Sequence, residues 1–377
     1  VDNVYTNNVP GGHMRAPGSP QTVFAEESHM DIIAQELGMD PLELRLKNIM
    51  QESDTNPEGH LVSPVRAEET LRKAAEAAGW SAPKPRPYVG RGMALYDRHT
   101  GSGQGNASLE AEADGTLVLR TPAWDQGVGT HTILRQIVAE ELSLSPELIR
   151  VVATDTDAVP FDSGVGGSRA THTAGQATYR AAQQLRRQLV DLAAAHLSVS
   201  AESVRLKDGQ FLADGDSTRA VSLTDLAARA TERGEPIAVR ATYTPDSWDH
   251  TTSFCAQVAE VEVDPETGQV TVLRFVSAHD VGTVLNPMTH QGQIDGGVVQ
   301  GIGHALMEEL RIDQGQVLTG HFGDYKIPTM RDIPELTTVI LEGPSGPAPY
   351  QARGIGETPN CPPAAAIVDE DPCLTRL

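Results

Sequence analysis

The chain has 377 residues, with 51 Asp and Glu against 29 Lys and Arg, so its formal net charge is −22. This acidity argues against nucleic-acid binding through phosphates, which needs clustered Lys and Arg, and no apolar run approaches the roughly 20 residues that span a bilayer. The length and a hydrophobic content of 39% predict a globular protein of two or three domains or lobes, without nucleic-acid or membrane partners.

The first 85 residues predict helices that follow an irregular start and a first glycine loop. One apolar stripe indicates a helix and consists of Met30, Ile33, Ala34 and Leu37. Gly38 is a natural stop for that helix, and Asp40 with Pro41 predicts the start of the next one. A third helix is expected over 67–78, and the closely spaced prolines of 81–87 favour a linker.

Strand patterns begin after this linker, and residues 86–240 are interpreted as a first α+β lobe. Alternating residues around the Asp114–Gly115 turn predict a hairpin, which is followed by a helix over 129–142 and a strand over 149–155. A long helix is expected over 174–197, and Ser222 predicts the cap of a short one.

Residues 241–377 are interpreted as a second α+β lobe, so the three predicted parts are 1–85, 86–240 and 241–377. A hairpin is clear over 256–276, and a glycine-rich helix is expected over 291–310. Each lobe contains a strand, a D-x-G triplet that begins at Asp125 or Asp280, and then a helix. The sequence therefore predicts an α+β fold with mixed sheets and flanking helices in two related lobes.

Glycine-rich loops are the main candidates for ligand binding. They cover 11–20, 125–132 and 162–177, and none is a phosphate loop of the Walker type or a dinucleotide fingerprint. Two of them lead into predicted helices, where backbone N–H groups can meet an anion or a polar ring. Tight-turn geometry is the alternative for each loop taken alone.

The predicted helix over 291–310 is interrupted by Gly292, Gly296, Gly297, Gly301 and Gly303. Each interior glycine costs a helix about 1 kcal/mol relative to alanine. Two explanations offset that cost, a crowded helix crossing or the close approach of a cofactor. Gln293, at the start of the segment, is placed to hydrogen-bond a ligand.

Glu357 is the most constrained carboxylate of the sequence. It follows Gly354 and Gly356 and precedes Pro359 and the pair Pro362–Pro363. A loop stiffened in this way predicts an acid that meets a buried reacting group.

Cysteine and histidine give no metal-binding pattern. Cys255, Cys361 and Cys373 form no C-x-x-C pair, and Cys361 is expected to be a small buried residue. His131 and His172 lie within glycine loops, where a solvated or core role is the better interpretation of each. Sparse, odd cysteines fit a reducing compartment, so a cytoplasmic location is predicted, with the periplasm as the alternative.

Five ordered motifs resemble the C-terminal half of the molybdenum-binding large subunit of the xanthine dehydrogenase and aldehyde oxidase family. They are TNNVPGGHMRAPGSPQTVFAEESHMDIIAQELGMDPLELRLKN, DQGVGTHT, GVGGSRATHTAGQA, HDVGTVLNPMTHQGQIDGGVVQGIGHALMEE and GIGETPNCPPAAAI. The similarity extends to about Ile367, and it implies the molybdopterin-binding fold of this family.

The resemblance implies a molybdenum–molybdopterin cofactor, as such or in its cytosine dinucleotide form, held without a protein ligand to the metal. Glu357 would be the catalytic base and Arg15 the arginine beside the metal. The residues that match cofactor-binding positions are Gln126, Gly127, Val128, Gly166, Gly167, Ser168, Arg169, Ala170, Gln293 and Gly356.

The family's chemistry also implies a role for other chains. A molybdenum-bound hydroxyl attacks an aldehyde or N-heterocycle, so the base must take its proton at hydrogen-bond distance, and water supplies the oxygen. Electrons leave through iron–sulfur clusters and FAD, which are expected on separate iron–sulfur and flavin subunits because the chain lacks cluster cysteines.

The resemblance departs from the family at both ends. The N-terminal half of the large subunit is expected on a partner chain, and this chain is expected to be inactive without it. After the last motif the sequence becomes VDEDPCLTRL instead of the family's usual continuation. The alternative interpretation is therefore an inactive or degenerate fragment that serves only in assembly.

Overall fold

The structure is a computed structural model that describes residues 12–56, 59–153, 161–245 and 252–368, and the single positions 5, 7, 155, 157 and 159. Most of the predicted irregular start, and the tail with Cys373, lie outside the described residues. The chain divides into two compact units. Unit 1 comprises Val1–His99, His250–Gly343 and Ile355–Leu377, and unit 2 comprises Thr100–Asp249 and Pro344–Gly354.

The two units are made of discontinuous segments, whereas the sequence predicted three consecutive parts, 1–85, 86–240 and 241–377. That three-part division stays a prediction. Strand β1 (Val89–His99) pairs along its whole length with β9 (Thr252–Val263), so residues from both sides of unit 2 share one sheet. The proline-rich stretch 81–87 contains neither helix nor strand, as expected, but it lies within unit 1.

Unit 1 is built on the sheet β1–β9–β10–β13, in which β10 (Val270–Gly282) pairs antiparallel with β9 and parallel with β13 (Glu335–Glu342). Its other elements are α1 (Ser19–Leu37), α2 (Pro41–Asn48), α3 (Ala67–Ala78), α7 (Pro287–Leu306), β11 (Ile312–Asp313), β12 (Gln316–Val317), the 3₁₀ turn η4 (Thr358–Asn360) and α8 (Pro363–Val368).

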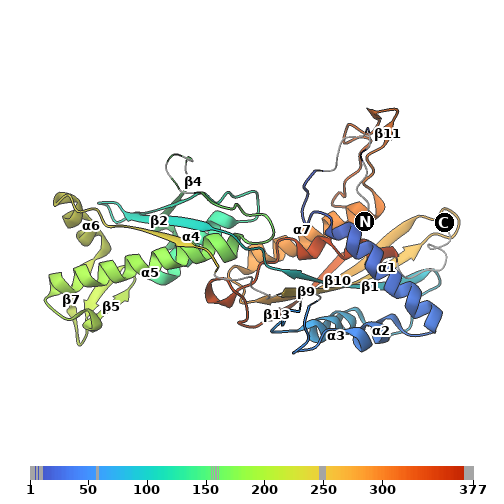
Figure 1. The fold of residues 1–377 in the computed structure, drawn as a ribbon, viewed down its shortest axis with the longest axis horizontal. Coiled ribbons are helices and arrows are strands. Elements are labelled where there is room, and N and C mark those ends of the chain that lie inside the picture. The colour runs from blue at the N-terminus through green and yellow to red at the C-terminus, as the bar shows by residue number, and fades with distance from the viewer. Residues whose placement is uncertain are drawn as a thin grey trace. The chain divides into compact units, whose positions relative to one another are not determined.

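Helices cover both faces of this sheet, with α3 on one side and α7 and α8 on the other (Figure 1). Neighbouring residues of one strand accordingly join different cores. Met93 packs under α3 with Val258 and Val276, whereas Ala94 packs with Phe275 beneath α7 and α8. A sheet buried on both faces explains why β9 is buried along most of its length.

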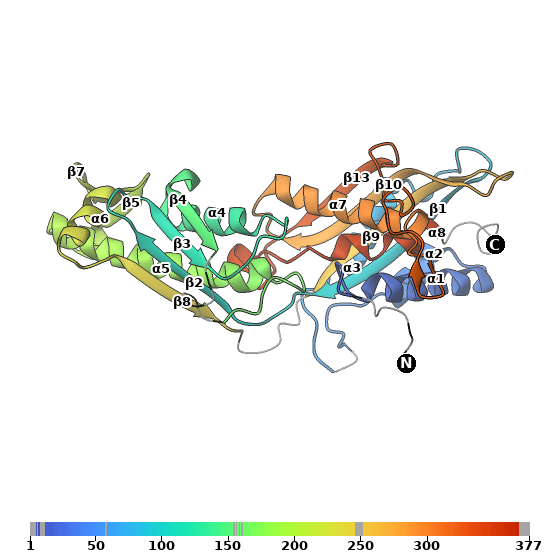
Figure 2. The ribbon, with the colours of Figure 1, turned by 90° about the horizontal axis from the view of Figure 1, so that it is seen from above.

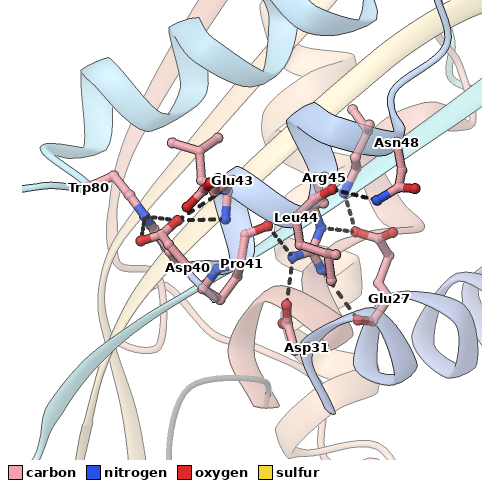
Figure 3. A network of polar contacts seen from close by, with 11 residues as sticks. Glu27, Asp31, Asp40, Pro41, Glu43, Leu44, Arg45, Asn48 and Trp80 are labelled. Atoms are coloured by element: carbon pink, nitrogen blue, oxygen red, sulfur yellow. Dashed lines mark hydrogen bonds and ion pairs between the residues drawn. The ribbon is translucent and has the colours of Figure 1, made fainter. Parts of the chain in front are cut away.

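A buried ion-pair network fastens α1 to α2 and to β1 (Figure 3). Arg45, which is 3% exposed, binds Glu27 at 2.9 Å and Asp31 at 2.5 Å. The same carboxylate oxygen of Glu27, Oε2, also accepts from the backbone N–H of Leu95 in β1, at 2.6 Å. Helix α1 is therefore held in a fixed register against α2 and β1.

Unit 2 is built on the sheet β4–β3–β2–β8, with the long helix α5 along one face (Figure 2). A smaller sheet, β5–β6–β7, packs beside α5. The elements are β2 (Gly105–Ala111), β3 (Leu117–Thr121), α4 (Thr130–Leu142), η1 (Pro146–Leu148), β4 (Ile149–Ala153), α5 (Ala170–Leu197), η2 (Ala201–Ser203), β5 (Val204–Lys207), β6 (Gln210–Ala213), β7 (Asp216–Ser222), α6 (Leu223–Glu232), β8 (Ala238–Tyr243) and η3 (Pro349–Gln351).

The two large sheets share one topology, which confirms the predicted α+β class with mixed sheets in two related lobes. In unit 2 the hairpin β2–β3 leads into α4, and β4 then pairs parallel with β3. In unit 1 the hairpin β9–β10 leads into α7, and β13 pairs parallel with β10. The fourth strand, β8 or β1, is antiparallel to the first hairpin strand in each unit.

The predicted helix boundaries are close to the observed ones, because their end signals are local. Asp40 accepts hydrogen bonds from two N–H groups at the start of α2, and Gly38 and Gly79 end α1 and α3 in the left-handed conformation. The stripe predicted for α1 is wrong at Leu37, which is 61% exposed. Only Ala34 of that stripe is buried, because α1 packs through a narrow face that includes Val23.

None of the helices in the described part of the chain is both long and apolar enough to cross a membrane.

Candidate functional site

Glu357 lies at the start of η4, in a loop whose own hydrogen bonds fix the backbone around it. Thr358 Oγ1 donates to the Ile355 carbonyl at 3.2 Å, and the Cys361 thiol donates to the Glu357 carbonyl at 3.3 Å. Thr358, Pro359 and Asn360 are buried directly behind the carboxylate residue. The loop is therefore a packed part of unit 1, as its prolines and glycines predict.

The glycines of α7 fall into two classes. A methyl group at Gly297 would lie 2.5 Å from Pro359 Cβ, and one at Gly301 would overlap the Pro363 ring. These glycines let the Glu357 loop and α8 press against α7, which is the crowded crossing. Gly292 and Gly296 face no atom within 4 Å among the described residues, so they leave an open helix face instead.

A buried polar chain anchors the same loop to the sheet. The Gln257 side-chain amide donates to the Pro359 carbonyl and to Ser277 Oγ, both at 2.9 Å. Ser277 Oγ lies 2.7 Å from His279 Nε2. Burial lowers the pKa of His279 to about 3, and electrostatic repulsion from His290 and Arg15 contributes less. This imidazole is therefore neutral at physiological pH.

Both carboxylate oxygens of Glu357 accept hydrogen bonds within unit 1. Oε1 accepts from the backbone N–H of Ala16 at 3.0 Å. Oε2 accepts from Arg98 Nε at 3.1 Å and Nη2 at 2.9 Å. Ala16 adopts a φ of 55°, a left-handed conformation that is unfavourable for alanine and common at functional sites.

Arg15 lies beside this carboxylate, and its hydrogen bonds to described residues go to backbone carbonyls. Its Nε donates to the Gly356 carbonyl at 2.5 Å, and Nη2 donates to the Gln293 carbonyl at 2.8 Å. Burial lowers the pKa of Arg15, with Cys361 and Glu357 acting in the opposite direction. The structure thus brings Arg15, Gln293, Gly356 and Glu357 together, as one part of the predicted site.

A cavity of about 450 Å³ adjoins Arg15 in unit 1. Its wall includes Pro17 just before α1, Phe24 of α1, His304 of α7 and Ala364 of α8. His304 Nε2 is buried and has no hydrogen-bond partner among the described residues. The volume lies in the range of small-ligand sites.

The other predicted cofactor residues belong to unit 2. Gln126, Gly127 and Val128 form the exposed or half-buried loop between β3 and α4, and Asp125 shapes that loop. Its carboxylate accepts from the N–H groups of Gly127, Gly129 and His131 at 3.0 to 3.3 Å. Burial raises the pKa of Asp125, but these bonds outweigh it and leave the pKa below its usual value.

Residues 166–170 form the turn that leads into α5. Gly167 accepts from the Gly101 N–H at 2.9 Å, and Arg169 Nη1 donates to the Ser102 carbonyl at 2.6 Å. Ser168 has a φ of 59° and lies two residues before Ala170, the first residue of α5. A methyl group at Gly354 would overlap the Ser168 carbonyl oxygen, so this loop packs tightly on the segment that precedes Glu357.

Several observations fit these residues to the polar, anionic ring system of a molybdopterin. Methyl groups at Gly127 and Gly166 would meet no atom within 4 Å among the described residues, so backbone groups are accessible there. Arg169 Nε is buried without a hydrogen-bond partner in the described part of the chain. The Gln293 side-chain amide likewise bonds to no described residue. These donors suit an anionic or carbonyl-bearing ligand.

The histidines that the sequence analysis weighed are structural. His172 is fully buried in α5, with Nδ1 3.0 Å from the Gly101 carbonyl and Nε2 3.0 Å from the Tyr243 hydroxyl. His131 is the second residue of α4, not a loop residue, and its Nε2 lies 3.0 Å from the Ala123 carbonyl. Cys361 is buried as expected, and burial raises the pKa of Cys361 to about 12.

Arg98 is the site residue that sequence reasoning missed. It lies on β1, 259 positions before the carboxylate that it binds. Nothing local in LYDRH marks it, because the pairing of β1 with β9 and the packing of η4 bring the two side chains together.

Comparison with known proteins identifies the family of this chain. The sequence matches the molybdopterin cofactor-binding domain over residues 65–334, and a second domain of that description over residues 1–49. The xanthine dehydrogenase molybdenum-binding subunit of Escherichia coli O157:H7 is 34% identical, over 96% of this chain and 51% of that protein. The aldehyde oxidoreductase molybdenum-binding subunit PaoC of Escherichia coli K12 is 30% identical, over 97% and 50%.

Solved structures agree. Quinoline 2-oxidoreductase from Pseudomonas putida 86 superposes with a TM-score of 0.82 at 27% identity, over 92% of this chain and 48% of that chain. The Cu,Mo-CO dehydrogenase gives the same score and identity, over 93% and 48%. The chain spans about half the length of the curated relatives it matches.

Proposed function

Since this chain belongs to the molybdopterin cofactor-binding family and corresponds to the C-terminal half of a xanthine dehydrogenase or aldehyde oxidase large subunit, we propose that it forms half of the active site of a molybdenum hydroxylase. The observation that carries the proposal is the fixed carboxylate of Glu357 beside Arg15, in a loop packed against the glycines of α7.

Glu357 is the proposed general base. A base must be held at one position, and the bonds from Ala16 N–H and Arg98 fix the two carboxylate oxygens of Glu357. As the general base, the Glu357 carboxylate would take up a proton when water-derived oxygen adds to the substrate carbon. The substrate class is an aldehyde or an N-heterocycle.

The residues proposed to hold the cofactor are those that match the family's motifs. In unit 1 they are Gln293, Gly356 and the cation Arg15, and in unit 2 they are the loop Gln126–Val128 and the turn Gly166–Ala170. The open glycines and the unpartnered Arg169 Nε support this assignment. When bound, the molybdenum cofactor accepts the two electrons released by the substrate. Its pterin is either the plain form or the cytosine dinucleotide.

Other chains complete the enzyme in this proposal. A partner carries the remaining half of the molybdenum subunit, and iron–sulfur and flavin subunits pass electrons onward. The chain alone is inactive, because half of the site belongs to the partner. The assembly works in the cytoplasm, or in the periplasm as the alternative.

A second candidate is a chain that serves only in assembly. It is favoured by the engagement of both Glu357 oxygens within unit 1 and by the half-length match to the relatives. Molybdenum and pterin content separates the two candidates. Molybdenum bound when the chain is co-expressed with its genomic neighbours supports the enzyme, and its absence from that complex supports the assembly role.

The base itself is tested by Glu357→Gln in the co-expressed complex. We expect turnover to fall about 10²- to 10⁴-fold, the usual contribution of general base catalysis, with the cofactor content unchanged. Glu260→Gln is the matched control, because Glu260 also pairs with an arginine at 2.7 Å and is comparably buried. Full turnover in Glu357→Gln would rule out the base role.

A further inference from the structure

Arg98 occupies an unusual position for a strand arginine. Its side chain is only 16% exposed, and it lies near the end of β1, where β1 pairs with Ser253 of β9. The strand therefore presents a cation inside unit 1 at the level of the Glu357 loop.

The guanidinium is held on more than one side. Nη1 donates to Ser19 Oγ at 3.2 Å and lies 3.3 Å from the Tyr96 hydroxyl. Nε and Nη2 both reach Oε2 of Glu357. Because a guanidinium is planar and rigid, contacts to α1 and β1 on one edge fix the direction of its other edge.

Arg98 and Arg15 contact different parts of the Glu357 loop. Arg15 binds the carbonyls of Gly356 and Gln293 and so fixes the backbone of the loop. Arg98 is the arginine with hydrogen bonds to the carboxylate oxygen. Burial by itself would lower the pKa of Arg98. The contacts with Tyr96 and Glu357 outweigh burial and raise the pKa above its usual value, so the guanidinium stays charged.

We propose that Arg98 is a positioning residue, which holds the Glu357 side chain in the one orientation that serves proton transfer. The inference rests on the proposed function, because it assigns Arg98 to the base. Arg98 acts through Glu357 and need not touch the substrate.

A purely structural pair on the same strand provides the comparison. Arg91 of β1 binds Glu260 at 2.7 Å, with side-chain exposures of 12% and 20% against 16% and 12% for Arg98 and Glu357. If Arg98 only stabilised the sheet, Arg91→Gln and Arg98→Gln would have the same consequences.

The deciding measurement is the reactivity of Glu357 toward a water-soluble carbodiimide and an amine, followed by mass spectrometry of the co-expressed complex. In Arg98→Gln we expect labelling of Glu357 to rise about tenfold, since a charge-assisted hydrogen bond no longer holds the carboxylate. Labelling of the exposed Glu309 should not change. Arg91→Gln should leave Glu357 at its original rate, and Arg98→Lys should restore part of the protection.

Turnover is measured in parallel, with benzaldehyde and hypoxanthine as probe substrates. Arg98→Gln should lower kcat about 10²-fold, as expected for a misplaced catalytic group, with KM changed less than kcat and molybdenum content unchanged. Unchanged labelling in Arg98→Gln would overturn the proposal whatever the activity, and increased labelling with full kcat would overturn the positioning role. Activity retained in Glu357→Gln would instead refute the proposed base, while the labelling result still reports on Arg98.

Discussion

Units 1 and 2 use the same strand–helix repeat but bury it differently. The sheet of unit 2 joins one continuous core through residues such as Leu109 and Leu119, beneath α4 and α5. The sheet of unit 1 has a separate core on each face, one beneath α3 and one beneath α7 and α8. The same topology therefore gives a two-layer unit with exposed loops and a three-layer unit with a packed Glu357 loop.

The D-x-G triplets show the difference at matching places. Asp280 ends β10 fully buried and lies 3.4 Å from Arg66. Asp125 follows β3 on the surface and gathers three backbone N–H groups. The aspartate of unit 1 belongs to the core, whereas that of unit 2 shapes a loop with open backbone around it.

The helices after these triplets differ for the same reason. Helix α4 packs through large residues, including Leu134 and Ile137. Helix α7 packs through Gly297 and Gly301, because Pro359 and Pro363 occupy the space where side chains would lie. Rigid support is thus concentrated around Glu357, and accessible backbone is concentrated in unit 2.

The sharpest test of this contrast compares ion pairs. Arg45→Ala leaves Glu27 and Asp31 buried without their cation, and we expect a loss of about 3–5 kcal/mol in the free energy of unfolding. Arg120→Ala in unit 2 removes a pair whose side chains are 35% and 38% exposed, which should cost about 0–1 kcal/mol. Urea unfolding of both variants measures the difference, and equal losses would contradict the contrast.

The next effect is a loss of stability in acid that originates in unit 1. The pKa of His279 is lowered to about 3 by burial, so between that pH and about 6.5 the unfolded chain binds more protons than the folded one. Its contribution is complete above pH 6.5 and falls by about 1.4 kcal/mol for each pH unit below that. At pH 5 the loss is about 2 kcal/mol.

Thermal unfolding from pH 7.5 to 5 measures this loss. His279→Gln, which does not titrate, should remove about half of the dependence, because burial also lowers the pKa of His290 to about 4 and His290 contributes over the same range. The exposed His60 replaced in the same way serves as the control. A slope that is unaffected in His279→Gln would show that other groups dominate.

The glycines of α7 provide an internal comparison within one helix. Gly297→Ala places a methyl group 2.5 Å from Pro359 Cβ, and overpacking of this kind costs about 1–3 kcal/mol, of which the better helix propensity of alanine recovers about 1. Gly296→Ala, one residue away on the open face, should instead stabilise the chain by up to about 1 kcal/mol. Opposite signs in urea unfolding are the expected result, and stabilisation by both would disprove the packing argument.

The elements themselves were largely predictable because their signals are short-range. Asp40 caps α2 and Ser222 caps α6, as expected from residues within one turn of each helix. The two hairpins follow from alternation around their turns, as Asp114–Gly115 illustrates. The position of Leu37 was not predictable, because it depends on how much of α1 its neighbours cover.

The site was predictable only as separate motifs. Glu357 was singled out by its glycines and prolines, but its bonds to Ala16 and Arg98 depend on packing between segments more than 250 residues apart. The glycines of α7 were recognised as costly, but only the structure separates Gly297, which meets Pro359, from Gly296, which faces open space. The sequence alone cannot distinguish these glycines, because a glycine in a helix can mark either a close packing contact or an open helix face.

The smallest expected effect concerns the loop of unit 2. Asp125→Ala removes the acceptor of three N–H groups, and loss of such a cap costs about 0.5–2 kcal/mol. Because the pKa of Asp125 lies below its usual value, its stabilisation is present at neutral pH and is lost as pH falls through that lowered pKa. The variant should therefore be less stable than the wild type at pH 7, and the difference should shrink as pH falls through the lowered pKa of Asp125.

Amide hydrogen exchange of residues 125–132 at pH 7 locates the effect, which should be faster exchange in Asp125→Ala with the Glu357 loop unchanged. Asp114→Ala is the control, because Asp114 accepts from the backbone N–H of a turn in the same unit, outside the proposed cofactor loops. If Asp125→Ala also loosened the loop around Glu357, the order of that loop would not come from its own packing within unit 1. The contrast between a packed Glu357 loop and an open Asp125 loop would then be incorrect.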